Sequence, residues 1–331
     1  MSNTLITTTK YNNLQQRISA LLGNSTSGTP QTGYGQTVRS DTHYPVQAPQ
    51  TTIITAEQYE DLYIDIVRAR VHQLGANNFT LNDYVKGSRE FGTGADKVEL
   101  TYITALESLM TDIETDKLIA HPTQMNIVDY EPVGNGYTDR RTDSWNTKLE
   151  HIFRITFSST ADRRHFFNAG GEIRIQATLK NPGNGKAEDW AGLLETAGII
   201  RFAATETLQT KDYDTNTFPT VTNPDIYGVG NYNLSTGYQT IFRKSSNALN
   251  NSGVYSSNLL QVDARNINDA TIQFKITIHD SAGDGNIDNI VIGQVETLIQ
   301  AATPDGTITI DGLDYDTVVL PSPIYSVITS I

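Results

Sequence analysis

"TIQFKITIHD", residues 271–280, decides the fold class of this chain, because its apolar and polar residues alternate strictly. Every second residue from Ile272 to Ile278 is apolar, and the residues between them are polar. A period of two is typical of a β-strand that places one face on a core. The stretches HIFRITF (151–157) and EIRIQATL (172–179) alternate in the same way. Turn-forming Pro, Gly, Asn and Asp residues separate such runs, so the chain after residue 122 is predicted to form a mainly antiparallel β-sandwich.

One segment of this β-rich region has the pattern of a helix. KAEDWAGLLETAG, residues 186–198, spaces its apolar residues at helical intervals and ends at a glycine. The stretch 205–262, rich in Tyr, Asn, Thr and Ser, gives only weak strand signals. We therefore expect an α+β protein whose sandwich carries one inserted helix.

The N-terminal third is predicted to be helical. The apolar residues from Tyr11 to Leu22 fall at helical spacing before Gly23. A second helix is expected over 55–75, where Thr55 and Gln58 have the spacing of a capping box. A third is expected over about 97–118, with a seam spaced by three, four and three residues that faces a neighbouring helix. The seam residues are Ile103, Leu106, Met110 and Ile113.

Residues 24–50 lie between the first two predicted helices and contain few large apolar side chains. Such a composition does not offset its own ordering entropy, so we expect a linker or an arm that orders only against a partner. The predicted organisation is an N-terminal helix and flexible arm over 1–50, a helical region over 51–122 and a mainly β domain over 123–331. Inter-subunit contacts are expected from residues 1–50 and from the 97–118 helix.

The composition excludes several kinds of site. The net charge is −13 and the pI is about 4.8, which argues against direct binding to a nucleic-acid backbone. The chain has no cysteine, which excludes disulfides and thiolate chemistry. The sequence contains no apolar run of about 18 residues, so no membrane insertion is expected. The first residues lack the apolar segment of a secretory signal. Charged residues are 18%, low enough to suit permanent contacts with other chains.

DRRHFFNAGG, residues 162–171, has the residue types of a catalytic cluster. A catalytic His165 would need a carboxylate to orient it and a nearby nucleophile, yet no nucleophile signature occurs here. The structural interpretation, which we prefer, is a polar turn followed by buried aromatic residues and a glycine turn with positive φ. Its arginines would face a partner or pair with Asp162 and Glu172. The predicted interface or structural residues are Arg163, Arg164, His165, Phe166, Phe167, Gly170 and Gly171.

HDSAGDGNIDN, residues 279–289, resembles a calcium-binding loop, because it places hard oxygen donors at short spacing. The spacing departs from that of an EF-hand, so an ordinary turn is the preferred interpretation. The weak candidate ligands are Asp280, Asp284, Asn286 and Asp288. The six histidines are dispersed, with no zinc-binding spacing, and we expect no cofactor. His72 is expected to be a packed or hydrogen-bonded residue.

Several segments, in this order along the chain, resemble virion structural proteins of tailed bacteriophages, especially contractile-tailed cyanophages and related marine or freshwater phages. DRRHFFNAGGEIRI, residues 162–175, is the most specific of them, whereas 205–262 matches nothing in that group. The resembling segments are YNNLQQRISALLG (11–23), GYGQ (33–36), ITAEQYEDLYIDIVRARVHQLG (54–75), FRITFSSTADRRHFFNAGGEIRI (153–175), ATIQFKITIHD (270–280) and GNIDNIVIGQVETLIQAATPDGTITI (285–310).

The resemblance implies a non-enzymatic component of the neck or collar, tail, baseplate or fibre apparatus. It implies a chain that is assembled in the bacterial host cytoplasm, forms a homo-oligomer and docks to other virion proteins. Two other functions stay open. One is a receptor- or carbohydrate-binding fibre module that binds host-surface glycans, with Tyr227, Tyr232, Tyr238 and Tyr255 as candidate platforms. The other is a polysaccharide depolymerase with a carboxylate pair. The sequence does not test this hypothesis, because some pair of carboxylates always occurs among 37 acidic residues.

Overall fold

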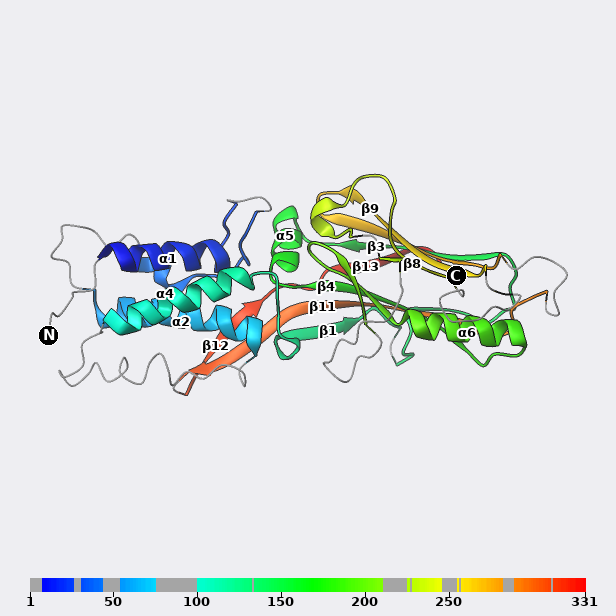
Figure 1. The fold of residues 1–331 in the computed structure, drawn as a ribbon, viewed down its shortest axis with the longest axis horizontal. Coiled ribbons are helices and arrows are strands. Elements are labelled where there is room, and N and C mark those ends of the chain that lie inside the picture. Colours follow the sequence, from blue (N-terminus) through cyan, green and yellow to red (C-terminus); the bar gives the residue numbers. More distant parts are fainter. Residues whose placement is uncertain are drawn as a thin grey trace. The chain divides into compact units, whose positions relative to one another are not determined.

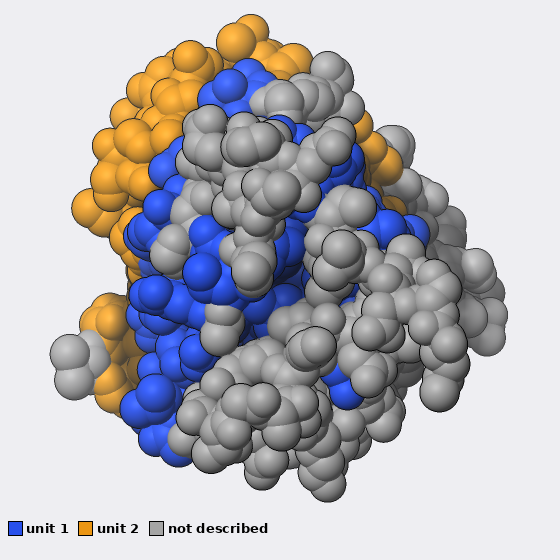
Figure 2. All heavy atoms as spheres, turned by 90° about the vertical axis from the view of Figure 1, so that its left-hand side faces the viewer, with its two compact units in different colours: residues 1–126, 164–170, 304–320 blue, residues 127–163, 171–303, 321–331 orange. Residues whose placement is uncertain are grey.

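The computed structural model describes residues 8–26, 31–43, 54–75, 100–132, 134–210, 225–226, 228–245, 255, 257–281, 289–310 and 312–331. The chain forms two compact units, which Figure 2 shows in different colours. Unit 1 contains residues 1–126, 164–170 and 304–320, and unit 2 contains residues 127–163, 171–303 and 321–331. The division differs from the expected one, because there is no boundary at residue 50 and because two later segments belong with the N-terminal region.

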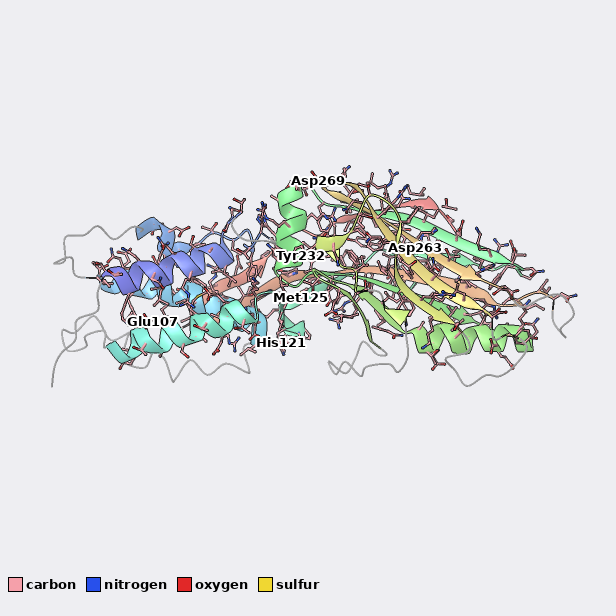
Figure 3. All side chains as sticks on the ribbon, turned by 45° about the horizontal axis from the view of Figure 1, so that its top comes forward. Glu107, His121, Met125, Tyr232, Asp263 and Asp269 are labelled. Carbon is pink, nitrogen blue, oxygen red and sulfur yellow. The ribbon has the colours of Figure 1, made fainter. Side chains whose placement is uncertain are left out.

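Among the described residues of unit 1, three α-helices lie side by side: α1 (Thr8–Leu22), α2 (Ala56–Leu74) and α4 (Leu100–Thr115). The apolar residues of α1 and the predicted seam of α4 join one core. Lys10 and Arg17 of α1 pair with Glu107 and Glu114 of α4, at 2.9 and 2.7 Å, and Figure 3 labels Glu107. Both pairs advance by seven residues in the same direction, so α1 and α4 run parallel.

The caps of α2 are those that the sequence predicts. The Thr55 hydroxyl accepts a hydrogen bond from the Gln58 backbone N–H, and the Gln58 side chain accepts one from the Thr55 N–H. Gly75 ends the helix with φ at 78°. The middle of α2 is buried on every side, which a single apolar stripe does not predict. Asp65 is buried there because it accepts hydrogen bonds from Ser40 and forms an ion pair with Arg68 at 3.1 Å.

Residues 31–43 are ordered by contacts with their own chain, contrary to the prediction of an arm that orders only against a partner. The side chains of Tyr34 and Val38 are buried in the core of unit 1. The Tyr34 N–H donates to the Leu21 carbonyl at 2.8 Å, and η1 (Arg39–His43) follows. The composition predicted the wrong state because two large buried side chains, together with backbone hydrogen bonds to α1, are enough to order this segment. Residues 27–30 and 44–50 lie outside the described part of the arm.

The β-strands of the described residues form two antiparallel sheets. The seven-stranded sheet contains β1 (Met125–Asp129), β2 (Asp139–Arg141), β4 (Glu172–Lys180), β5 (Ile199–Phe202), β6 (Thr207–Thr210), β11 (Gln294–Ile310) and β12 (Leu313–Val319). The six-stranded sheet contains β3 (Lys148–Thr156), β7 (Asp225–Ile226), β8 (Gln239–Ser245), β9 (Leu259–Asn268), β10 (Thr271–His279) and β13 (Ile324–Thr329). The end of β11 and all of β12 belong to unit 1.

The two sheets face each other in unit 2, which confirms the predicted sandwich. The stretch 271–279 is the strand β10, between β3 and β9, and its apolar residues are buried. Phe274 of β10 contacts Phe202 of β5, in the other sheet, with ring centroids 5.3 Å apart. The strict alternation therefore predicted this strand correctly, because its apolar face meets the opposite sheet.

Two helices accompany the strands. The predicted helix is α6 (Gly185–Ala197), and the Asn184 side chain caps it by accepting from the Ala187 N–H at 3.0 Å. The second helix, α5 (Thr160–Asn168), replaces the polar turn that we expected within residues 162–171. The α+β class is confirmed, with its N-terminal helices and an antiparallel sandwich that carries the inserted helix α6.

Candidate functional site

The helix α5 forms because Ser159 caps it. The Ser159 hydroxyl accepts a hydrogen bond from the Asp162 backbone N–H at 3.0 Å. A serine followed three residues later by an acidic residue is a helix-start signal, and it was available in the sequence. Gly170 follows the helix with φ at 78°, and a Cβ there would lie 2.8 Å from the Ala120 nitrogen. The expected positive φ is confirmed at Gly170, and Gly171 is not among the residues with positive φ.

Arg163 is a buried structural residue of unit 2. Its guanidinium donates to Asn231 Oδ1 at 2.8 Å, to Asn266 Oδ1 at 2.6 Å and to the Asn268 carbonyl at 3.2 Å. Burial lowers the pKa of the Arg163 guanidinium to about 10, and the charge of Asp269, labelled in Figure 3, opposes this shift. Arg163 therefore joins the start of α5 to the β9–β10 turn and does not face a partner.

The remainder of α5 holds the segment 31–35 in unit 1. Arg164 donates to Gln31 Oε1 at 2.9 Å and to His165 Nε2 at 3.0 Å. The Asn168 amide donates to the carbonyls of Gln31 and Gly33, both at 2.9 Å. The contact of His165 Nε2 is therefore with the guanidinium of Arg164, a cation. The pairing of either arginine with Asp162 or Glu172 was predicted wrongly.

Glu172 pairs instead with two other arginines. Its carboxylate accepts from Arg174 at 3.1 Å and forms a second, shorter ion pair with Arg201. Burial raises the pKa of the Glu172 carboxyl, but the two arginines outweigh burial and leave the pKa below its usual value. This ion-pair group ties β4 to β5 within one sheet.

The two aromatic residues of α5 are fully buried, and their rings meet edge to face with centroids 5.1 Å apart. They are Phe166 and Phe167. The α4 seam is likewise buried inside unit 1, with Ile103, Leu106, Met110 and Ile113 in its core. These side chains stabilise the chain itself, and the seam faces neighbouring helices as predicted. Contacts between subunits through the 97–118 helix stay a prediction.

His72, also in unit 1, is packed as expected. Its Nε2 lies 2.9 Å from the Ala169 carbonyl, and its ring contacts that of Tyr34. Burial lowers the pKa of His72 to about 4, although the hydrogen bond to Ala169 opposes the shift. The neutral imidazole is therefore a structural donor that fixes the end of α5.

Of the four candidate calcium ligands, the structure describes Asp280. Asp280 is buried, and its Oδ2 lies 2.6 Å from Lys186 Nζ. An ammonium group at this position would compete with a metal ion for the carboxylate. Asp284, Asn286 and Asp288 lie outside the described residues. Within the part of the chain that the structure describes, no group of three or more His, Asp or Glu side chains is placed to hold a metal ion.

The tyrosines proposed as sugar platforms have other contacts. Arg265 lies 4.5 Å and Lys275 lies 4.7 Å from the ring centroid of Tyr238. These two cations occupy the aromatic surface on which a sugar would stack. Burial raises the pKa of Tyr232, labelled in Figure 3, to about 12, and Tyr255 is partly buried. Tyr227 lies outside the described residues.

The C-terminal strand β13 is the feature of the surface that sequence reasoning missed. It pairs with β3 and ends the six-stranded sheet, and no strand among the described residues pairs with its other edge. Residues 320–331 contain no charged side chain. Three large apolar side chains are exposed along β13, namely Ile324 at 69%, Val327 at 49% and Ile328 at 48%. An uncharged, apolar and open edge is a template for pairing with another strand.

A buried polar contact holds β13 against the sandwich. His151 Nε2 lies 3.0 Å from the Tyr325 hydroxyl, and His151 Nδ1 lies 2.9 Å from Thr297 Oγ1. Burial lowers the pKa of His151 to about 4, and the charge of Asp139 opposes the shift. Asp139 also accepts a hydrogen bond from the Ile331 N–H at 3.0 Å. The open edge is therefore a firmly positioned strand and not a loose tail.

No helix in the described part of the chain has both the length and the apolar character needed to cross a bilayer. No protein-family model, curated protein sequence or solved structure matches this chain.

Proposed function

We propose that this chain is a non-enzymatic structural subunit of a tailed-bacteriophage virion that assembles with further copies of itself. The resemblance of residues 162–175 and five other segments to phage virion proteins supports the virion assignment. The open edge of β13 is the observation that supports self-assembly. Its place in the virion would be the neck or collar, tail, baseplate or fibre apparatus, where it would also dock to other virion proteins.

The strand that pairs with the open edge of β13 is the β13 strand of a second copy of the chain. Two identical strands that pair antiparallel about a two-fold axis form a closed interface, because each edge satisfies the other. The absence of charge over residues 320–331 suits this arrangement, since identical charged strands would place like charges opposite each other. Pro321 and Pro323 precede the strand, so they do not remove a backbone donor from its outer edge.

Light scattering on the purified full chain tests this proposal. The wild-type chain should have twice the 36.4 kDa mass of one copy, or a larger even multiple. The double variant Ile324→Lys/Ile328→Lys should have half the wild-type mass, because two lysines on each edge repel the partner. Leu313→Lys is the matched control, since Leu313 is 57% exposed on another strand and should leave the mass unchanged. An unchanged mass in the double variant would refute pairing through β13.

A further inference from the structure

Three polar side chains of unit 2 meet at a buried position. Lys186 is the second residue of α6, Asn258 directly precedes β9 and Asp280 directly follows β10. The side chains of Lys186 and Asp280 are 2% and 0% exposed, and Asn258 is fully buried. Lysine and aspartate are rarely buried to this extent, so their contacts call for a chemical explanation.

One carboxylate contacts both an amine and an amide in this cluster. Asp280 Oδ2 lies 2.6 Å from Lys186 Nζ. The Asn258 amide nitrogen donates to Asp280 Oδ1 at 3.0 Å, and the Asn258 amide oxygen accepts from Trp190 Nε1, also at 3.0 Å. The neighbours set this orientation of the amide, because an indole N–H only donates and an ionised carboxylate only accepts.

A helix start and a pair of indole rings lie at this cluster. Lys186 lies in the first turn of α6, where the helix dipole disfavours a positive charge. The ring of Trp145 packs on that of Trp190, with centroids 5.4 Å apart, beside the cluster. The Asp280 carboxylate, 2.6 Å from Nζ, is placed to exchange a proton with the amine. A desolvated, neutral lysine is a nucleophile.

We propose that Lys186 and Asn258 form an isopeptide bond without an added enzyme or cofactor. After proton transfer to Asp280, the Lys186 Nζ attacks the Asn258 Cγ, and the Trp190 N–H stabilises the negative charge that develops on the amide oxygen. Asp280 delivers its proton to the departing amide nitrogen, and the carboxylate that this leaves takes the proton that the attacking nitrogen gives up. The new Nζ–Cγ bond replaces the Cγ–Nδ2 bond, and one ammonia molecule leaves. No oxidant or reductant is needed.

The backbone around Asp280 holds the carboxylate in place. Thr147, a β-branched residue, has φ at 76°, a conformation that such residues rarely adopt. Its carbonyl accepts a hydrogen bond from the Asp280 N–H at 2.7 Å. A strained residue that anchors a reactive group is a recurring arrangement at functional sites.

The bond would serve a chain that has no cysteine and hence no disulfide. It would join α6 to the start of β9 and close a loop of about 70 residues, which is the range in which a cross-link strongly restricts the unfolded chain. The proposed link would therefore make the sandwich resistant to heat and to mechanical force.

Intact-mass spectrometry of the denatured full chain tests the proposal. The mass should be lower than the sequence mass by about 17 Da, which is the mass of ammonia. A tryptic digest should contain one branched peptide that joins residues 181–201 to residues 245–265, because an acylated Lys186 resists trypsin. An unchanged mass, with the two peptides separate, would overturn the proposal. A loss of about 18 Da at a Lys186–Asp280 link would also overturn it, because water would then have left and Asn258 would be intact.

Variants separate this bond from other losses of ammonia. Lys186→Arg keeps the positive charge but should show the full mass and separate peptides. Ring closure at Asn184–Gly185 also releases ammonia, and it would persist in Lys186→Arg, which would contradict the proposal. Asp280→Asn should abolish the bond. Trp190→Phe keeps all three reacting groups and should form the bond more slowly, which a time course of intact mass after synthesis would show; an unchanged rate would contradict the role of Trp190.

Discussion

Replacing His151 with glutamine should flatten the fall in stability that this chain shows when the pH drops from 7.5 to 5. The folded state holds the pKa of His151 at about 4, below the ordinary value of 6.5, because the imidazole is buried. The unfolded state therefore binds a proton first as the pH falls, and stability is lost between pH 6.5 and 4. The loss reaches a constant value below pH 4, where the folded state is protonated as well.

The size of this effect follows from the two pKa values. At pH 5 the unfolded histidine is almost fully protonated, whereas the folded one is only about one-tenth protonated. The resulting loss is about 2 kcal/mol between pH 7.5 and 5, out of a full loss of about 3 kcal/mol. Glutamine keeps a hydrogen-bonding group between Tyr325 and Thr297 but does not titrate. His151→Gln should therefore lose about 2 kcal/mol less than the wild-type chain over this range.

Urea unfolding at the two pH values measures the difference. Trp145 and Trp190 are the only tryptophans and both lie in unit 2, as His151 does, so their fluorescence reports on the relevant unit. The exposed His279, replaced by glutamine, is the matched control for the removal of one histidine. Equal pH dependence in His151→Gln and the wild-type chain would refute the assignment of a buried, neutral imidazole.

Three further substitutions test the packing. Arg201→Ala should cost about 3 kcal/mol in urea unfolding, because it leaves the buried Glu172 with one cationic partner fewer; a loss under about 1 kcal/mol would contradict this. Gly35→Ala should cost at least about 1 kcal/mol in thermal unfolding followed by circular dichroism, because φ is 72° and the Cβ would lie 2.3 Å from His165 Nδ1. A Tm equal to that of the wild type would refute the close approach of His165. Met110→Ala should cost about 2–5 kcal/mol by the same method without changing the oligomeric state, because Met110 lies in the core of unit 1. A change in the oligomeric state without a loss of stability would instead indicate that Met110 lies at an interface between subunits.

The fold was predictable where a local pattern reports directly on burial. The alternation from Ile272 to Ile278 identified β10, and the capping pair Thr55 and Gln58 identified the start of α2, because each signal lies within a few residues. The helix α5 was missed because most of its nine residues are polar and its apolar residues form no stripe. The local signal for this helix is its cap at Ser159.

The candidate sites depend on contacts that no local pattern carries. The contact between His151 and Tyr325 joins residues 174 positions apart, and nothing in either neighbourhood indicates it. The same holds for Lys186 and Asp280, which lie in α6 and beyond β10. The open edge of β13 is a property of sheet order, and sheet order depends on which strands pair over long distances. Sequence alone therefore identified the class of the fold but not the surface and cluster that we propose to be functional.

A single cysteine tests the central claim, self-assembly through β13, most directly. The chain has no cysteine, so Ser326→Cys places one thiol per copy at the middle of the exposed strand. We place the two-fold axis at Ser326, so that in an antiparallel pair of β13 strands the two thiol-bearing residues would lie opposite each other, about 5 Å apart, within the range of a disulfide. Mild oxidation should give a covalent dimer of twice 36.4 kDa on a non-reducing gel, while Ser144→Cys, exposed elsewhere in unit 2, should stay at 36.4 kDa. A Ser326→Cys chain that remains at the mass of one copy would contradict the account.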